Sequence, residues 1–339
     1  MLLIDKIKLK EMIDNKLVSV QKHPEADLYI YNYTQIVQYD RIWNDITLMT
    51  RGLILDVDFN IVSRPINKFF NLEEHDLNEI PNLDFDVYEK LDGSLGILYW
   101  LNDKPYIASR GSFTSEQANK ATKILYDKYS HLFHKIDKKS TYIFEIIYPE
   151  NRIVVDYGDM EDIILLTVIN NETGEERIDD IGFNMVKKYD GINDINMLKS
   201  LEENNKEGFV IKFKNNFRVK VKFNEYVRLH RIITNVSNIV IWEYLSENKP
   251  FDELLERVPD EFFNYVKNTK NDLINHFNSI LNECKDVYKE LENRKETALY
   301  FKTQKYPSIL FGMLNNKNVD KIIWKLVKPK FSKPFSNEH

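Results

Sequence analysis

Apolar and polar residues alternate in short runs over the first two thirds of the chain. From about residue 28 to 223 these runs are rich in Ile, Val, Tyr and Phe, a composition typical of β-strands. Turn sequences separate them: NDK at 102–104, NNETGEE at 170–176 and KNN at 214–216. Helices are expected to interrupt the strands at 116–133 and 180–203. Because no regular βαβ alternation is present, the pattern predicts an α+β fold with mostly antiparallel sheets.

The spacing of apolar residues changes after about residue 224. There they recur three and four positions apart, which is the period of an α-helix. Prolines stand where these helices would start, at Pro250, Pro259 and Pro307. We therefore predict two domains, a strand-rich domain over residues 1–234 and an all-helical C-terminal domain over residues 235–339.

The formal net charge of −6 argues against a protein that binds nucleic acid through its overall charge. Any phosphate binding must therefore be local. Lysines gather in residues 317–333, where six of them accompany a single acid, Asp320. That tail could contact a polyanion, although a solvated basic end is the simpler interpretation.

The single cysteine, Cys284, cannot form an internal disulfide, which favours a reducing compartment. The sequence has no apolar run of about 18 residues, and charges interrupt the N-terminal MLLIDKIKLKEM too early for a signal-peptide core. These features predict a soluble, cytoplasmic protein without membrane contact. We also expect a monomer.

Lys90 lies in VYEKLDGSLGILYW (87–100), where one lysine and one aspartate interrupt an apolar run. A lysine that is partly desolvated among other cations can lose its proton near neutral pH and become a nucleophile. An isolated strand lysine more often has its stem on the core and its ammonium group in water. The neighbouring charged residues must decide between the two interpretations.

The segment FRVKVKF alternates strictly, which places Arg218, Lys220 and Lys222 on one face of a strand. Three like charges in a row require either solvent or an anion opposite them, and a polyphosphate is the more specific interpretation. Arg51 in MTRGLILD and Lys68 in RPINKFFN would supply a forked donor and a point charge for phosphate oxygens.

Two carboxylates lie within apolar strands. Glu145 is in the middle of TYIFEIIYPENRIVVDYGD, and Glu207 opens EGFVIKF beside a glycine. Because burying an unpaired carboxylate is costly, each is expected to accept hydrogen bonds, for example from ribose hydroxyls or from a lysine. An edge-strand salt bridge is the alternative for either.

Several of these elements occur in an order that is typical of one enzyme family. KLDG (90–93) has the K-x-D-G form of the covalent nucleotidyltransferases, and FEIIYPENRIVVDYG, EGFVIKF and KVKF follow it. With the upstream RG, the KFFN element and the PENRIV segment, residues 29–230 resemble the RNA ligases of the bacteriophage T4 RNA ligase 1 type. The resemblance implies that residues 1–234 form an adenylyltransferase domain.

The resemblance also implies a reaction. Lys90 would attack the α-phosphate of ATP, release pyrophosphate and keep AMP through a phosphoramide bond. AMP would then pass to a 5′-phosphate on RNA, and a 3′-hydroxyl would displace it to seal the strand. Lys220 and Lys222 would contact the phosphates and help to keep the Lys90 amine unprotonated, and Arg51 and Lys68 would join them.

The remaining site residues follow from their motif positions. Glu145 is assigned to the ribose, and Glu207 to a place near the nucleophile where it would orient Mg²⁺ through water. Asp92 and Gly93 are assigned to nucleotide binding, and Phe70 or Tyr33 to the adenine unless they are core aromatics. Tyr226 and His230 are assigned to the acceptor RNA. Mg²⁺ is expected from the phosphoryl chemistry. No metal-ligand spacing occurs in the sequence, so the direct ligands stay open.

RNA with 5′-phosphate and 3′-hydroxyl ends is the expected partner, and the resemblance suggests broken tRNA. The chain has no G-x-x-x-x-G-K-[ST] phosphate loop, so a separate kinase and phosphatase would have to prepare the ends. DNA ligases and mRNA capping enzymes share the lysine chemistry but usually add a β-rich domain after the KVKF-like strand, where this chain continues as helices. A non-catalytic nucleic-acid binding module would not need the residues for turnover, and a purely structural protein would leave the ordered motifs to coincidence.

Overall fold

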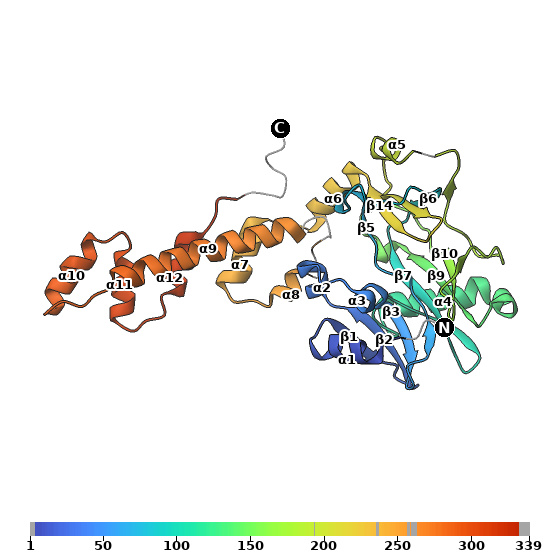
Figure 1. Ribbon diagram of the computed structural model, residues 1–339, viewed down its shortest axis with the longest axis horizontal. Coiled ribbons are helices and arrows are strands. Elements are labelled where there is room, and N and C mark those ends of the chain that lie inside the picture. Colours follow the sequence, from blue (N-terminus) through green and yellow to red (C-terminus); the bar gives the residue numbers. More distant parts are fainter. Residues whose placement is uncertain (1–3, 193, 235–236, 256–257, 259–262, 332–339) are drawn as a thin grey trace. The chain divides into compact units, whose positions relative to one another are not determined.

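A computed structural model describes residues 4–192, 194–234, 237–255, 258 and 263–331 of the 339-residue chain. The chain divides into two compact units, Met1–His230 and Arg231–His339. Figure 1 shows that the first unit contains the sheets and that the second is built from helices. This α+β architecture, with antiparallel sheets followed by a helical region, confirms the predicted fold class.

The first sheet of the N-terminal unit has the strand order β1-β2-β3-β4 and is antiparallel throughout. Its strands are β1 (Val18–Lys22), β2 (Leu28–Tyr33), β3 (Arg51–Asp56) and β4 (Ile61–Ser63), and three helices precede or connect them, α1 (Lys6–Asp14), α2 (Gln35–Asp40) and α3 (Asp45–Met49). Leu9 of α1 and Ile46 of α3 pack with Leu53 and Leu55 of β3, so these helices cover one face of the sheet. The strand β3 begins at Arg51 and carries that cation at the edge of the core.

The second sheet has the order β11-β10-β9-β7-β8. Its strands are β7 (Ser94–Leu101), β8 (Lys104–Ala108), β9 (Ser140–Ile147), β10 (Asp162–Asn170) and β11 (Glu176–Arg177). The helix α4 (Glu116–Tyr129) packs on this sheet through Ala121, Ile124 and Leu125, which meet Tyr142 and Phe144 of β9. Together with the short 3₁₀ segment Ser130–Lys135, α4 confirms the helix predicted at 116–133.

The third sheet has the order β12-β6-β13-β14-β5, and only the pair β14 and β5 is parallel among its described strands. Its strands are β5 (Phe70–Asn71), β6 (Phe85–Lys90), β12 (Lys188–Tyr189), β13 (Gly208–Phe213) and β14 (Arg218–Lys222). Lys90 ends β6 and Ser94 begins β7. The K-L-D-G sequence therefore carries the chain from the third sheet to the second.

The prediction of one helix over 180–203 was wrong. The described part of this segment holds the short strand β12 and only five helical residues, α5 (Ile195–Lys199). Backbone hydrogen bonds explain the difference: Val186 N–H donates to Leu165 O at 2.9 Å, and Glu89 N–H donates to Lys187 O at 2.9 Å. Strand pairing with β10 and β6 thus overrides a local helical pattern.

Gly208 fixes the register of the third sheet beside the K-x-D-G loop. It pairs with Lys90 on one side and with Lys222 on the other. Its φ is +146°, and a Cβ at this position would lie 2.0 Å from the carbonyl oxygen of Val221. Only glycine fits this close approach of two strands.

All of the regular secondary structure in the described part of the second unit is helical. Its helices are α7 (Asn238–Ser246), α8 (Phe251–Leu255), α9 (Phe263–Val287), α10 (Arg294–Thr303), α11 (Pro307–Leu314) and α12 (Asp320–Val327), and α6 (Asn224–Thr234) runs into this unit from the first. Trp242 of α7 donates its indole N–H to Trp324 O of α12 at 2.8 Å. Pro307 begins α11 and Pro250 directly precedes α8, as predicted, whereas Pro259 lies outside the described residues.

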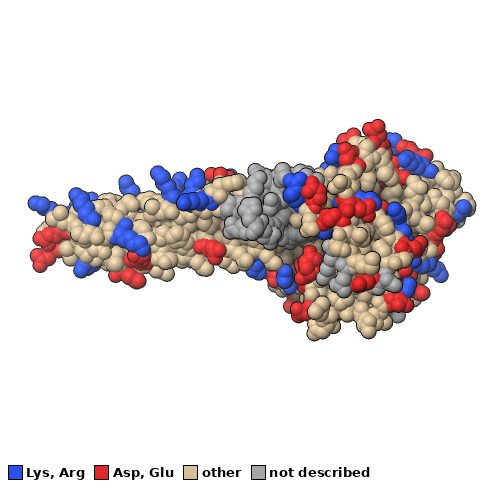
Figure 2. Space-filling view, turned by 90° about the horizontal axis from the view of Figure 1, so that it is seen from above, with Lys and Arg blue, Asp and Glu red and all other residues tan. Residues whose placement is uncertain are grey.

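Lys and Arg side chains lie along the visible face of the helical unit, among fewer Asp and Glu side chains (Figure 2). Lys321 and Lys325 of α12 are exposed, which fits the solvated basic end considered above. Lys333 is outside the described residues. None of the described helices is both long enough and apolar enough to cross a membrane.

Replacement of Gly208 by alanine should destabilise the N-terminal unit by about 2–4 kcal/mol, because the new Cβ would collide with backbone of β14. Gly191→Ala is the matched control, since Gly191 also has a positive φ of +78° but has no heavy atom within 4 Å of the place that a Cβ would take. Urea unfolding of both variants measures the difference. Equal losses in the two variants would contradict the close-approach argument.

Candidate active site

A pocket lies between the second and third sheets, at the end of β6. Cations and acids line it together with apolar side chains; the charged lining residues are Arg51, Glu89, Lys90, Glu145, Lys212 and Arg218. Leu166 of β10 and Val210 of β13 belong to the same lining and come from opposite sheets. The pocket therefore combines a slot of apolar residues with a charged end at Lys90.

Glu207 joins two of the predicted lysines. Lys90 Nζ donates to Glu207 Oε2 at 2.6 Å, and Lys222 Nζ lies 3.1 Å from Glu207 Oε1. Glu207 is only 4% exposed. Burial alone would raise the pKa of Glu207, but the charges of Lys90 and Lys222 outweigh it, and the pKa is lowered from its ordinary value. The carboxylate is thus an ionised bridge between two ammonium groups.

The resemblance implied that cations and Glu207 lie near Lys90, and in the structure the Glu207 carboxylate lies between the ammonium groups of Lys90 and Lys222. The side chain of Lys90 is 20% exposed, and it is linked to Lys222 of the basic strand β14 through Glu207. It is therefore not a lysine that extends into water, and Lys90, Lys222 and Glu207 meet as the motif order implied.

The loop after Lys90 is held by hydrogen bonds to side chains. Gly93 N–H donates to Glu145 Oε1 at 3.0 Å, so this predicted acceptor takes a backbone donor rather than a lysine. Desolvation by burial raises the pKa of Glu145 to about 7, although the charge of Lys90 opposes the shift. Gly93 also lies against β9, where a Cβ would be 2.5 Å from Ile146 O.

Asp92 is buried, and protein groups occupy both of its carboxylate oxygens. The hydroxyl of Tyr226 donates to Oδ1 at 2.8 Å, and the N–H groups of Val154 and Val155 donate to Oδ2. Tyr226 is 3% exposed, and its ring lies 5.4 Å from that of His230. Tyr226, predicted to face the acceptor RNA, thus directs its hydroxyl inward to the K-x-D-G loop.

The cations on β14 do not face plain solvent. Arg218 donates through both terminal nitrogens to Glu176, with Nη1 and Oε1 2.7 Å apart, and Lys212 Nζ lies 3.2 Å from Glu176 Oε2. The charges and hydrogen bonds of Arg218 and Lys212 lower the pKa of Glu176 although burial opposes them. Lys220, between Arg218 and Lys222 on the strand, is buried.

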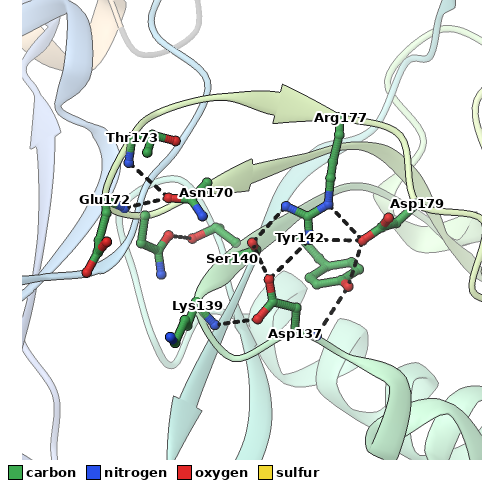
Figure 3. Close-up of polar contacts among 11 residues, drawn as sticks. Asp137, Lys139, Ser140, Tyr142, Asn170, Glu172, Thr173, Arg177 and Asp179 are labelled. Atoms are coloured by element: carbon green, nitrogen blue, oxygen red, sulfur yellow. Dashed lines mark hydrogen bonds and ion pairs between the residues drawn. The ribbon is translucent and has the colours of Figure 1, made fainter. Parts of the chain in front are cut away.

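Figure 3 shows how the hairpin that carries Glu176 is fixed. Arg177, the next residue, donates from Nη1 to Ser140 Oγ at 3.0 Å, from Nη2 to Asp137 Oδ2 at 3.2 Å and from Nε to Asp179 Oδ2 at 3.1 Å. Tyr142 Oη donates to the same Asp179 oxygen. This network anchors β11 to β9, so that Glu176 reaches the cations of the third sheet.

Lys68 has an aromatic environment. Its ammonium nitrogen lies 5.8 Å from the ring centre of Tyr33, 5.7 Å from that of Trp43 and 5.6 Å from that of Phe70. Such contacts stabilise a buried cation. Lys68 and Phe70 line a cleft next to the Lys90 pocket, and neither Tyr33 nor Phe70 belongs to the lining of the pocket itself. Phe69 does belong to it.

Sequence reasoning missed Arg110. This residue lines a second adjoining cleft with Arg51, Gly93 and Ser94, on the side of the loop that follows Lys90. Its guanidinium carbon lies 5.5 Å from the ring centre of Tyr33. The sequence feature that could have indicated Arg110 is its place in SRGS, directly after the strand β8, where Gly111 allows a turn.

The site does not contain a protein metal-ligand set. Among the described residues, no three His, Cys, Asp or Glu side chains converge as metal ligands. Glu145 and Glu207, the carboxylates near Lys90, accept hydrogen bonds from Gly93 and from lysines. The protein groups at this site therefore do not fit a resident metal ion.

Residues 49–226 match the family described as RNA ligase. The match spans more than half of the chain, and the chain belongs to this RNA ligase family. The antiparallel sheets of the N-terminal unit are accordingly the adenylation fold of a nucleotidyltransferase ligase, and the helices follow it.

Curated relatives are similar over most of this chain. The RNA ligase of Rhodothermus phage RM378 is 25% identical over 364 residues, which cover 81% of this chain and 82% of the phage protein. A provisionally named RNA ligase of Thermovibrio ammonificans is 29% identical over 282 residues, 77% of this chain and 71% of that protein. A provisionally named bifunctional polynucleotide kinase/RNA ligase of Autographa californica nuclear polyhedrosis virus is 26% identical over 288 residues, 74% of this chain but 40% of the viral protein. The aligned region thus spans less than half of that relative's length.

The raised pKa of Glu145 predicts a pH dependence of stability. The folded chain keeps a proton on Glu145 up to about pH 7, whereas the unfolded chain releases it near the ordinary value of 4.5. Stability should therefore fall as pH rises from 4.5 to 7, by up to about 3 kcal/mol. Glu145→Gln should remove this part of the fall between pH 5 and 8, as measured by urea unfolding.

The exposed Glu150 provides the control, because Glu150→Gln should leave the wild-type pH profile unchanged. If Glu145→Gln and wild type lost the same free energy of unfolding between pH 5 and 8, the proposed protonation of Glu145 would be excluded.

Proposed function

We propose that this chain is an ATP-dependent RNA ligase that forms a covalent lysyl-AMP at Lys90. In this proposal the adenylyltransferase domain predicted at 1–234 performs the nucleotide chemistry, and the helical domain predicted at 235–339 assists with RNA. The observation that supports it most is the ion-paired set of Lys90, Glu207 and Lys222 at the end of the pocket, within the K-x-D-G context.

The first step requires a free amine. The ammonium group of Lys90 must lose one proton before attack, and Glu207 Oε2, 2.6 Å from Nζ, is placed to accept it. Nζ then attacks the α-phosphorus of ATP, the N–P bond forms, and the bond to the bridging oxygen breaks. Pyrophosphate leaves with that electron pair, and the nitrogen releases its second proton to solvent, which gives a phosphoramide with an uncharged nitrogen.

The surrounding cations would stabilise the charge that develops on the phosphates. Lys220 and Lys222 on β14 are assigned to the α-phosphate and the leaving pyrophosphate. Arg51 lines both the Lys90 pocket and the adjoining cleft, so it would serve the same phosphates together with Arg110. Lys68 lines the other adjoining cleft, and it too is assigned to stabilise the charge on the phosphates.

The nucleoside would occupy the rest of the pocket. Glu145 is assigned to a ribose hydroxyl, since it lines the pocket together with Lys90. Leu166 and Val210 would enclose the adenine from opposite sheets. We propose these two residues for that role ahead of Phe70 and Tyr33, whose rings lie around Lys68.

Two further steps would complete ligation. A 5′-phosphate oxygen of RNA attacks the phosphorus of lysyl-AMP, the N–P bond breaks, and a pyrophosphate-linked RNA adenylate forms. A 3′-hydroxyl oxygen then attacks the 5′-phosphorus, loses its proton and releases AMP. His230 is kept as a candidate contact of the acceptor RNA, while Tyr226 is assigned to support of Asp92.

A divalent ion supplies charge neutralisation to phosphoryl transfer. Because the described side chains offer no complete ligand set, ATP and water would carry most of its coordination. We propose Mg²⁺ as this ion.

The biological substrate proposed is a broken RNA, with cleaved tRNA as the first candidate. The viral relative is named for a kinase as well as a ligase activity. Since this chain has no phosphate-loop sequence of the G-x-x-x-x-G-K-[ST] form, we propose that a separate end-healing protein supplies the 5′-phosphate and 3′-hydroxyl ends.

Incubation with labelled ATP and Mg²⁺, without RNA, should give a covalent adduct that survives denaturation. Lys90→Ala should give none, because the nucleophile is absent. Lys188→Ala is the matched control, since Lys188 lies in the same sheet but pairs with Asp86 outside the pocket. A wild-type chain that stays unlabelled, or a labelled Lys90→Ala variant, would rule out the proposed nucleophile.

A second assay separates an RNA ligase from the competing functions. With a 5′-phosphorylated donor RNA and a hydroxyl-ended acceptor, the wild-type chain should produce a joined strand and AMP, as seen by gel electrophoresis. An mRNA capping enzyme would prefer GTP and would not join the strands, a DNA ligase would join DNA in preference, and a non-catalytic module would bind without product.

A further inference from the structure

The segment Pro149–Tyr157, sequence PENRIVVDY, has no role in the chemistry described so far. It begins after β9 with a 3₁₀ turn, Pro149–Asn151, and continues without regular structure. Four of its hydrogen bonds go to the loop of residues 91–94 that follows Lys90, while Asp156 pairs with Asn205 and Asn151 also reaches Ile146 of β9. Those contacts suggest what the segment does.

Hydrogen bonds in both directions join Asp92 to this segment. The N–H groups of Val154 and Val155 donate to Asp92 Oδ2 at 2.8 and 2.9 Å. In return, the N–H of Asp92 donates to the hydroxyl oxygen of Tyr157 at 2.8 Å. Asp92 is 4% exposed, so each of these groups would be costly to leave unpaired.

Asn151 makes a second link at the other end of the loop. Its side-chain Oδ1 accepts from Ser94 Oγ at 3.1 Å, and its Nδ2 donates to Ile146 O at 3.0 Å. Ser94 is the first residue of β7, and Ile146 is in β9. Asn151 therefore ties the end of the loop to the second sheet.

The loop needs such support because it crosses between sheets. Lys90 is the last residue of β6 in the third sheet, and the backbone has left ladder pairing before Ser94 begins β7 in the second. The amine must be held in line with the phosphorus and its leaving oxygen, and an error of about 1 Å can reduce the rate by a factor of about 100. Anything that fixes residues 91–94 also fixes the base from which Lys90 extends.

We infer, on the basis of the proposed function, that residues 149–157 clamp the loop after Lys90 and that Tyr157 and Asn151 are positioning residues for lysine adenylation. Tyr157 lines a cavity together with Asp92 and Asn151, next to the loop. Desolvation by burial raises the pKa of Tyr157, so its hydroxyl stays uncharged beside the carboxylate of Asp92.

The test uses Tyr157→Phe in the full chain, which removes one oxygen and keeps the ring. The rate constant for formation of lysyl-AMP at saturating ATP should fall about tenfold or more, while the apparent KM for ATP changes less than about threefold. Sealing of a chemically pre-adenylated RNA should stay within about threefold of wild type, because that step does not use the Lys90 amine. Amide hydrogen exchange in peptides that cover residues 90–95 should become faster.

Tyr148→Phe is the matched control. Tyr148 is buried and lines the same cavity, and its hydroxyl makes no hydrogen bond to residues 91–94, all of which the structure describes. It should leave adenylation and exchange unchanged. Asn151→Ala provides a second positioning variant, with the same pattern of a lowered rate constant and preserved sealing, should Tyr157→Phe fold poorly.

Two results would overturn the inference while leaving the proposed function intact: wild-type adenylation rates in both Tyr157→Phe and Asn151→Ala, or an equal loss of adenylation and of pre-adenylated sealing in both. A wild-type chain that forms no lysyl-AMP would instead refute the proposed function, and this inference with it.

Discussion

The buried carboxylate of Glu207 is the constraint on which the site depends. An ionised group with 4% exposure is stable only when partners offset its lost hydration, and here Lys90 and Lys222 do so from the two neighbouring strands. The register of β6, β13 and β14 decides which lysines can reach it. A shift of one residue would turn these side chains to the other face of the sheet. The narrow approach at Gly208 therefore sets the chemistry as well as the fold.

The same principle recurs at the other end of the pocket, where Glu176 lies between Arg218 and Lys212. In both places the strand cations have an internal acid as their partner, which explains how a chain of net charge −6 keeps a cluster of positive groups in one place. A polyphosphate that enters would share these cations with the acids rather than meet bare charges. Binding would then depend on geometry more than on total charge.

Local patterns in the sequence were sufficient for most of the strands and for the charged residues that meet at Lys90, whereas β1 and β12 were not predicted. Strict alternation in FRVKVKF placed Lys220 and Lys222 on one face, and the apolar setting of Glu145 and Glu207 indicated carboxylates with partners. The identity of the partners was harder to predict. Glu176 reaches Arg218 from another sheet, through a hairpin that Arg177 anchors. The spacing of residues within one segment does not indicate such a contact. The aromatic setting of Lys68 was missed for the same reason, because Tyr33, Trp43 and Phe70 come from three separate segments.

In the segment 180–203 the local pattern gave a wrong prediction. Its local pattern favoured a helix, while backbone pairing with Leu165 and Glu89 was available from outside the segment. Strand partners that lie far away in the sequence supply hydrogen bonds that a local helix would otherwise have to make for itself. In this segment, as around Glu176 and Lys68, a non-local partner decided the outcome.

Tyr226 belongs to the first turn of α6, and that helix runs on to Thr234 although the N-terminal unit ends at His230. A truncated enzyme that stopped at His230 would retain only about two turns of α6, a length at which an isolated helix is marginal in water. The hydroxyl of Tyr226 supports Asp92 only while the backbone around residue 226 stays helical. Any minimal version of the N-terminal unit should thus include the whole of α6, even though the last residues of this helix lie past the boundary between the units.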